Sequence, residues 1–441
     1  MLNKLVFGAL SALIFLTPIP YGTVEPWWKA AFVCAVFATC ILALIESLII
    51  GKIEIRGRSV LLPMLALSAL AFLQTLSLGA RTEASLSVWN AISADPYQTR
   101  FFALQMFALT AFLALLYNYA STERRIRVLV YTVLAIAVVS AVFGILRHST
   151  QQQTGFFLPL LKQNQGYGQF INKNHFAYLM EMAFGLGLGI ILGGGVKRDR
   201  LMIYVAVLLP IWTALVLANS RGGVLAMIAQ IVVAVLLLTS VQKITQSVAL
   251  RAVLLVALVT GIVLGTIWVG GDRLATNFEN ASSELASDTL RQGVSRNEIW
   301  RATLKMFAAH PILGVGLGGY WIGITAYHDA SGLMTPQEAH NDYLELLSSG
   351  GVMGFALGIW FVVAVARRAR QNLVEDVSYM RAVRFGAILG IVGVAAHSLV
   401  DFGLHITVNA VVLLILITMA TNRTERGSAG STSTQLPEGR I

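Results

Sequence analysis

The residue best suited to chemistry in this sequence is His340, which stands in the polar run Gln337-Glu338-Ala339-His340-Asn341-Asp342-Tyr343. A neutral imidazole can accept a proton near neutral pH, as is needed to deprotonate a sugar hydroxyl that attacks an activated anomeric carbon. His340 also lies near the point where a polar stretch, residues 271–350, gives way to a hydrophobic run. An ionisable group there is costly unless it has a partner or a function. We therefore predict that His340 is a catalytic base; the alternative is a histidine with a purely structural role.

Two arginines are candidates for binding an anion. Arg221 lies in the short turn Asn219-Ser220-Arg221-Gly222-Gly223, where two glycines let a ligand approach the backbone closely. Arg296 lies near the start of a predicted helix in the long polar stretch. A guanidinium stays charged and presents a planar set of donors that matches phosphate oxygens. The alternatives are a side chain that snorkels to lipid headgroups for Arg221 and a solvated helix face for Arg296.

A second polar group lies near the end of the chain and comprises His397, Asp401 and His405, and Glu181 is similarly placed in an earlier hydrophobic run. Ionisable residues within membrane segments are usually functional. At a spacing of four residues, His397 and Asp401 would share a helix face, so that one orients the other. We expect these side chains to support the site rather than to react.

The composition excludes a soluble protein. Of the 441 residues, 56% are hydrophobic and only 12% are charged, whereas soluble domains carry about 25% charged residues. The formal charge of +10 is spread over short loops, a pattern typical of membrane orientation rather than of nucleic-acid binding. Cys34 and Cys40 lie in one hydrophobic run, and His340, Asp342 and Glu345 lack the spacing of a zinc protease motif, so we predict no disulfide and no metal site.

Hydrophobic runs of about 20 residues are long enough to cross a bilayer, and they predict an all-α polytopic membrane protein with about twelve transmembrane helices. If the N-terminus is cytoplasmic, most of the 32 Lys and Arg residues fall in alternate, inner connections. We therefore expect both termini to be cytoplasmic and the long polar loop to lie outside. The predicted spans lie near 5–19, 29–50, 59–78, 101–119, 128–146, 175–194, 201–219, 222–240, 252–270, 352–366, 384–400 and 404–421.

This pattern divides the chain into four regions. Residues 1–270 carry spans one to nine, 271–350 form an outer loop domain between spans nine and ten that contributes to the active site, and 351–421 carry spans ten to twelve. The tail, 422–441, is rich in Ser, Thr and Gly and is expected to be disordered. Within the loop, Ser295 and Glu298 fit a capping box that begins a helix, which His310-Pro311 ends.

Several short motifs occur in a recognisable order and on one side of the predicted membrane. They are Phe170-Ile171-Asn172-Lys173-Asn174-His175-Phe176, Ser220-Arg221-Gly222-Gly223, Arg296 with Trp300, His310-Pro311-Ile312-Leu313-Gly314-Val315-Gly316, and His340-Asn341 followed by Gly351 and Gly354. Together they resemble the bacterial O-antigen ligase/polymerase superfamily, whose members have a large periplasmic loop late in the chain. The resemblance covers most of residues 100–421.

The resemblance implies an integral membrane glycosyltransferase of the bacterial inner membrane. Members of this family move a glycan from an undecaprenyl diphosphate carrier to an acceptor at the periplasmic face, without a metal or other cofactor. By this resemblance His340 is the base that activates the acceptor hydroxyl, and Arg221 and Arg296 bind the diphosphate. Arg291 and Arg301 are alternatives to Arg296. Further candidates for substrate binding or support are Lys173, His175, Asn341, His397 and Asp401.

The motifs leave the acceptor open. A ligase passes the glycan to lipid A-core, a polymerase passes it to another lipid-linked glycan, and a protein is a third possible acceptor. A flippase for lipid-linked glycans, or another transporter, is the alternative from a different class. A transporter is expected to carry charged groups in both halves of the membrane and is often built from internal repeats, which this sequence does not show.

Overall fold

The computed structural model describes residues 2–76, 91–150, 158–161, 166–240, 296–328, 336–375 and 379–423. Within these ranges the regular elements are all helices and no strand is formed; Tyr167 and Phe170 form an isolated β-bridge. The all-α prediction is confirmed for these residues. The helices are α1 (Leu2–Leu16), α2 (Pro26–Ile50), α3 (Arg58–Gln74), α4 (Pro96–Tyr119), α5 (Glu123–Ser149), α6 (Lys173–Leu192), η1 (Arg198–Arg200), α7 (Leu201–Leu217), α8 (Arg221–Ser240), α10 (Arg296–Ala309), α11 (Tyr320–Gly323), η3 (Ile324–Ala326), α12 (Asp342–Glu375), α13 (Tyr379–His397), η4 (Gly403–His405) and α14 (Thr407–Thr421).

Eight segments of the described chain are helical, long and apolar enough to cross a membrane, namely α2, α4, α5, α6, η1 with α7, α8, α12 and α13. Three shorter apolar helices, α1, α3 and α14, accompany them. Each predicted span other than 252–270 coincides with one of these helices. Residues 252–270 lie outside the described ranges, as do 271–295 of the predicted outer loop, so the number of spans and the side on which the loop lies stay predictions.

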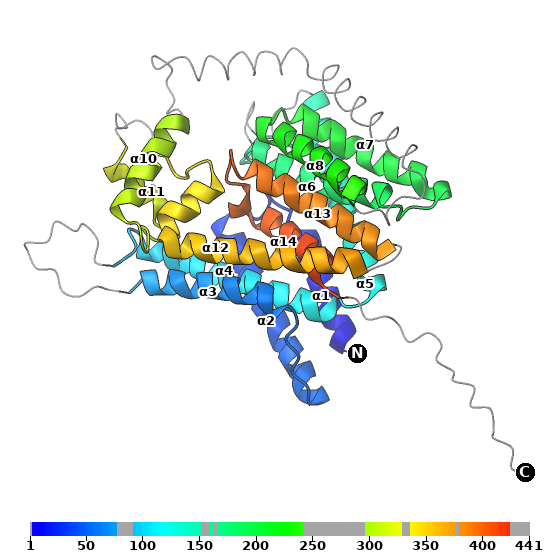
Figure 1. Cartoon of the computed structure of the whole chain (residues 1–441), viewed down its shortest axis with the longest axis horizontal. Coiled ribbons are helices and arrows are strands. Elements are labelled where there is room, and N and C mark those ends of the chain that lie inside the picture. Colours follow the sequence, from blue (N-terminus) through cyan, green and yellow to red (C-terminus); the bar gives the residue numbers. More distant parts are fainter. Residues whose placement is uncertain are drawn as a thin grey trace, which may run out of the picture.

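The centre of the bundle is the contact between α6 and α13 (Figure 1). Gly189 on α6 faces Gly386 on α13 so closely that a β-carbon at Gly189 would lie 2.2 Å from the α-carbon of Gly386. Gly185 and Gly390 repeat this close approach along the same pair of helices. Small residues let two backbones pack tightly, and such packing stabilises helix pairs within a bilayer. It holds α6 in the middle of the protein, with its N-terminus at one end of the bundle.

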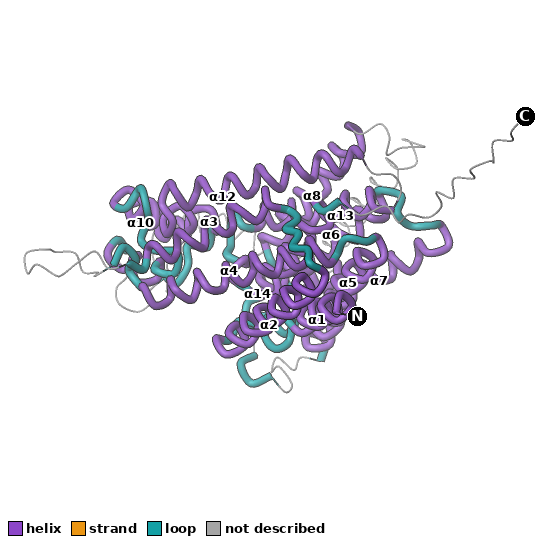
Figure 2. Tube along the Cα trace, turned by 90° about the horizontal axis from the view of Figure 1, so that it is seen from below, coloured by secondary structure: helices purple, strands orange, loops and turns teal. Residues whose placement is uncertain are grey.

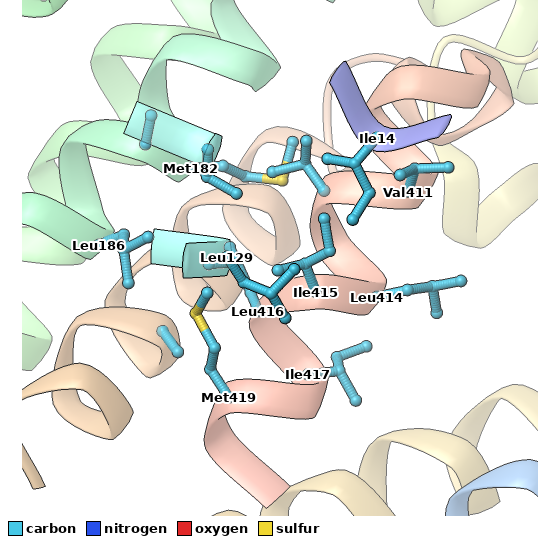
Figure 3. Close-up of a cluster of buried hydrophobic side chains, with 14 of the residues drawn as sticks. Ile14, Leu129, Met182, Leu186, Val411, Leu414, Ile415, Leu416, Ile417 and Met419 are labelled. Carbon is cyan, nitrogen blue, oxygen red and sulfur yellow. The ribbon is translucent and has the colours of Figure 1, made fainter. Parts of the chain in front are cut away.

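Apolar side chains from α1, α5, α6 and α14 pack together beside this contact (Figure 3). Ile14, Leu129, Met182, Leu186 and Ile415 are fully buried there. The cluster fixes α14 against α6. The short connection from α13 to α14, residues 398–406, is thereby held beside the N-terminus of α6.

Helix α12 runs along one side of the molecule next to α3 (Figure 2) and is broken at Gly351. The Gly351 backbone has φ 62° and ψ −167°, and a β-carbon there would lie 2.2 Å from the carbonyl oxygen of Ile312. The loop before α11 bonds across the break, since the Val315 N–H donates to the Ser348 carbonyl at 3.1 Å. The Gln74 amide group donates to the Ser349 carbonyl at 2.9 Å. Contacts from α3 and from the loop before α11 therefore stabilise the break. It separates a first half-helix, 342–350, from the long second part of α12.

A small domain of α10, α11 and η3 lies at the start of α12 (Figure 1). Met306, Val315, Tyr320 and Ile324 form its apolar core. The helix predicted to end at His310-Pro311 is confirmed from Arg296 to Ala309, while its predicted cap, residue 295, lies outside the described part of the chain. Because α10 packs against α12, its first residue lies at the end of the bundle where α12 begins.

Candidate active site

Asp401 is the residue on which the candidate site converges. Its side chain is 1% exposed and lies in the connection between α13 and α14. The Asn174 side-chain amide donates to Oδ2, and the Phe402 N–H donates to Oδ1 at 2.9 Å. Arg296 Nη2 lies 3.7 Å from Oδ2, and His340 Nδ1 lies 3.7 Å from Oδ1. One carboxylate thus connects the starts of α6 and α10 with the histidine that precedes α12.

Asp401 is held as a carboxylate by these neighbours. Burial alone would raise its pKa, but the interaction with His340, the Phe402 N–H and the charges of His175 and Arg296 together lower the pKa of Asp401 to about 2. A buried carboxylate needs such compensation, because an unpaired charge away from water is very costly. Asp401 therefore carries a full negative charge at any pH at which the protein is expected to work.

His340 is fixed in an unusual backbone conformation, with φ 51°. The Trp300 indole N–H donates to the Ala339 carbonyl at 3.0 Å, and the Ala339 N–H donates to Glu345 Oε2 at 2.8 Å. The His340 ring packs edge-on to Phe402, with 4.9 Å between ring centroids, and a third of its side chain is exposed. A positive φ in a residue other than glycine costs energy and is often found at functional sites. The arrangement holds the ring at a solvent-accessible edge of the site with Nδ1 toward Asp401.

Asn341 caps α12. Its Oδ1 accepts hydrogen bonds from the Tyr343 and Leu344 N–H groups, both at 3.0 Å. Its amide donates to the Leu399 carbonyl at 2.9 Å. Asparagine is among the preferred residues at a helix N-terminus because its side chain satisfies N–H groups that have no partner within the helix. Asn341, predicted as a possible substrate contact, therefore joins the start of α12 to the connection that holds Asp401.

The turn before α8 brings Arg221 and Lys173 together. Asn219 adopts a left-handed conformation with φ 52°, and Ser220 Oγ accepts a hydrogen bond from the Gly223 N–H at 3.2 Å. Lys173 Nζ donates to the Asn219 carbonyl at 3.0 Å. Both cationic side chains are exposed, and their charges lie close enough to repel each other. Because the residue after Lys173 bonds to Asp401, the first turn of α6 links this cationic turn to His340.

His397 lies behind the cationic turn, inside the bundle. It is fully buried, and its Nδ1 lies 2.8 Å from Glu181 Oε2. Its ring stacks on Tyr178 with centroids 4.0 Å apart. A β-carbon at Gly222 would lie 2.2 Å from the His397 ring. The predicted pairing of His397 with Asp401 on one helix face is wrong, because α13 ends at His397 and the carboxylate of Glu181 on α6 binds the imidazole instead.

The other predicted residues occupy different places. His175 is buried, its ring packs edge-on to Phe402 with centroids 4.9 Å apart, and its carbonyl accepts a hydrogen bond from the Asn409 amide at 3.0 Å. Arg301 is exposed further along α10. Of the described arginines predicted to bind diphosphate on α10, Arg296 is the one paired with Asp401, and residue 291 lies outside the described ranges.

A second imidazole, His405, joins the site on its acidic side. His405 Nε2 lies 3.3 Å from Glu345 Oε1 and 3.7 Å from Asp342 Oδ1. The His405 ring also packs edge-on to Phe402, with centroids 5.9 Å apart. Sequence reasoning placed His405 among the residues expected to support the site, but it did not place Asp342, Glu345 or Asn174 there. The signal was present for Asp342 and Glu345, whose spacing of three puts both carboxylates on one face of the first turn of α12.

The site therefore has two electrostatic sides. Arg221, Lys173 and Arg296 form a cationic side, and Asp342, Glu345 and His405 form an acidic side, with His340, Phe402 and Asp401 between them. A cationic side suits an anionic leaving group such as diphosphate. Carboxylates suit sugar hydroxyls because they accept hydrogen bonds. Within the part of the chain that the structure describes, no group of three or more His, Cys, Asp or Glu side chains has the arrangement needed to hold a metal ion.

One comparison with known proteins finds a match. Residues 205–359 match the family model described as O-antigen ligase. The match covers about a third of the chain, so this segment is similar to the O-antigen ligase family. Together with the described helices that are long and apolar enough to cross a membrane, the match supports a multi-pass membrane protein that acts in lipid-linked glycan transfer. The matched segment contains Arg221, Arg296 and His340, whereas Lys173 and Asp401 lie outside it. Comparison with curated proteins gives no match.

Proposed function

We propose that the protein transfers a glycan from undecaprenyl diphosphate to an acceptor hydroxyl at the outer face of the bacterial inner membrane. The observation that carries this proposal is the pairing of both His340 and Arg296 with Asp401, each 3.7 Å from one of its oxygens. A base and a cation held by one carboxylate lie close enough to act on the two ends of the same substitution. The match of residues 205–359 to the O-antigen ligase family model supports the assignment.

The chemistry follows from the roles of the three groups. His340 Nε2 takes the proton of the acceptor hydroxyl while the acceptor oxygen attacks the anomeric carbon of the carried glycan. The bond from that carbon to the diphosphate oxygen breaks, and the diphosphate leaves on its lipid. Asp401 holds the Nδ1 side of the ring and stabilises the imidazolium that forms, as carboxylates do beside a histidine base. His340 then releases its proton to solvent through its exposed edge.

Arg221 and Arg296, with Lys173 nearby, stabilise the negative charge that develops on the departing diphosphate. Fixed cations directed at developing charge are usually the largest single contribution to such catalysis. The mechanism needs no metal, because the positive charge comes from guanidinium groups. Arginine is favoured here over lysine, since its planar donors bind two phosphate oxygens at once.

A flippase is less well supported than an enzyme. The described residues of the candidate site gather where α6, α8, α10 and α12 begin and where α13 ends. A carrier that passes charged cargo across the membrane would be expected to present polar groups along the whole path. Groups clustered at one end favour chemistry at one face.

The acceptor is decided by a deletion experiment. Removing the gene and separating the cell-surface polysaccharides on a gel distinguishes the options. A complete lipid A-core that lacks all long chains indicates a ligase, and a core capped with a single repeat unit indicates a polymerase. An unchanged pattern in lipopolysaccharide and exopolysaccharide, together with loss of glycan from a protein, indicates the protein acceptor.

A further inference from the structure

A second cationic site lies at the opposite end of the bundle from His340. Helix α3 begins at Arg58 and ends at Gln74, which bonds to the break in α12 next to the candidate active site. Helix α12 begins at Asp342, beside His340, and passes Arg368 on its way to its other end. Beyond the break at Gly351, the straight part of α12 from residue 352 to residue 368 rises about 24 Å, most of the roughly 30 Å hydrocarbon thickness of a bilayer. The two sites therefore lie at opposite ends of α12.

This end of the bundle holds a cavity of about 430 Å³. Four of its seven lining residues are arginines from four places in the sequence: the two sides of Gly57, α12 and the residues after α14. The cavity is lined by Ile55, Arg56, Gly57, Arg58, Arg368, Asn422 and Arg423.

The walls of the cavity are fixed by buried contacts. Gly57 has φ 76° and packs on Tyr117 so closely that a β-carbon would lie 2.5 Å from the ring. The Asn422 amide donates to the Tyr117 carbonyl at 3.0 Å, and the Asn422 carbonyl accepts a hydrogen bond from the buried Arg384 guanidinium at 2.8 Å. The Arg56 N–H donates to Asn118 Oδ1 at 3.3 Å. The backbone that carries the arginines is therefore preorganised, as a binding site requires.

The charge around the cavity is strongly positive. Glu54 lies 3.3 Å from Arg56 and neutralises part of that charge, but Glu54 is half exposed and sits outside the lining. Arg58, Arg368 and Arg423 add three further guanidinium groups around the same space. An anion placed in this space would be attracted by all four guanidinium groups. Guanidinium groups bind phosphate oxygens in pairs, which makes a phosphate group the best-matched anion.

We propose that this cavity binds the phosphate group of an anionic membrane lipid, at the face opposite the glycan-transfer site. A lipid is favoured over free phosphate because Ile53 and Ile55, beside Arg56, are 67% and 51% exposed and can contact the glycerol and acyl region. Basic residues at a membrane surface attract anionic headgroups in the same way. The site anchors the ends of α3, α12 and α14 to the lipid surface and does not depend on the proposed glycan transfer.

The test is selective lipid retention. The full-length protein is reconstituted in nanodiscs with equal amounts of phosphatidylglycerol and phosphatidylcholine and released for native mass spectrometry. Wild-type protein is expected to retain phosphatidylglycerol preferentially, and the Arg58→Gln/Arg368→Gln variant is expected to lose that preference by about 30-fold, the effect of two basic groups. The matched control, Arg124→Gln/Arg198→Gln, removes two exposed arginines away from the cavity and should keep the wild-type preference.

A single-residue variant and a competition experiment with inorganic phosphate complete the test. Arg423→Gln removes one exposed group after α14 and should lower the preference by about 5-fold, even if the double variant fails to fold. Equal retention of the two lipids by wild-type protein, or equal preference in the wild-type protein and the cavity variants, overturns the proposal. Release of phosphatidylglycerol by added inorganic phosphate overturns the lipid assignment and makes a soluble phosphate the ligand.

Discussion

At the scale of single residues, the carboxylate of Asp401 interacts with both the proposed base and a proposed diphosphate-binding arginine. Asp401 is buried, keeps its charge because its pKa is lowered to about 2, and faces both His340 and Arg296. A neutral amide at the same place would keep the shape and lose the charge. Asp401 is therefore a positioning residue that couples the proposed base to the proposed anion site.

Replacing Asp401 with Asn is expected to lower kcat for glycan transfer by about 10²- to 10⁴-fold, because the imidazolium formed by His340 loses its counter-charge. The measurement is transfer by purified, reconstituted protein, with Asp199→Asn, an exposed acid in η1, as the matched control. A kcat within 3-fold of wild type would contradict the role given to Asp401.

Glu338, two residues before His340, gives a prediction about pH. Burial raises its pKa above the ordinary value of 4.5, the charges of His405, His340 and Lys29 oppose this, and Glu345 adds to it. The pKa of this carboxyl is higher in the folded protein than in the unfolded protein. As the pH rises above 4.5, the unfolded protein therefore loses the proton first, and the free energy of unfolding falls until the pH reaches the raised pKa. Glu338→Gln is therefore expected to raise the apparent Tm at pH 7 and to leave it unchanged at pH 4. An equal shift of Tm at both pH values would show that ionisation of Glu338 is not the cause.

At the scale of elements, buried contacts set the positions of the exposed charged groups. The turn that carries Arg221 rests on His397, which α13 contributes and Glu181 on α6 holds at 2.8 Å. The start of α12 is set by the Asn341 cap and by the break at Gly351. The conformation of Arg221 and the placement of His340 thus depend on helices that contribute no reacting group.

Gly222→Ala tests this dependence, because its methyl group would meet the His397 ring. We expect a loss of transfer of about 100-fold in the wild-type background, the effect of displacing a binding group by about 1 Å. In the Glu181→Gln/His397→Ala background, where the ring is gone and no buried charge is left unpaired, the same substitution should cost less than about 10-fold. Equal losses in the two backgrounds would mean that His397 does not position the turn.

At the scale of the whole molecule, the sequence was sufficient to predict the positions of the helices and the exposed candidate site residues. It was not sufficient to predict which of these residues contact one another. Hydrophobic runs locate helices because their length is set by the bilayer, and every predicted span within the described residues coincides with a helix. The partner of Asp401 could not be read from spacing. Its hydrogen bond from Asn174 and its ion-pair contacts with Arg296 and His340 join residues far apart in the chain, and they depend on how α6, α10 and α12 pack.

The same limit explains the error over His397. A spacing of four residues predicts a shared face only if the helix continues, and α13 ends at His397. The break in α12 was also not predicted, since two glycines before a hydrophobic run equally fit the end of a loop. In each case a contact from another helix, Glu181 on α6 or Gln74 on α3, decides the local structure.

The orientation of the whole protein gives a topology prediction. In a background with Cys34 and Cys40 replaced by Ala, we expect Thr325→Cys, near the candidate active site, to react with an impermeant thiol reagent added to spheroplasts. Gln371→Cys, near the cationic cavity, should react only after the membrane is permeabilised. Both side chains are exposed, so access across the membrane decides the outcome. If Gln371→Cys reacts in intact spheroplasts and Thr325→Cys reacts only after permeabilisation, the candidate active site lies at the cytoplasmic face and the proposed orientation is wrong.

The most direct test of the central claim is a single-turnover measurement on reconstituted protein loaded with glycan-bearing undecaprenyl diphosphate. If His340 is the base, His340→Ala should bind the donor as wild type does and transfer the glycan about 10²- to 10⁴-fold more slowly, whereas Arg221→Ala should bind the donor more weakly. Transfer by His340→Ala at the wild-type rate, with the donor bound normally, would contradict the account.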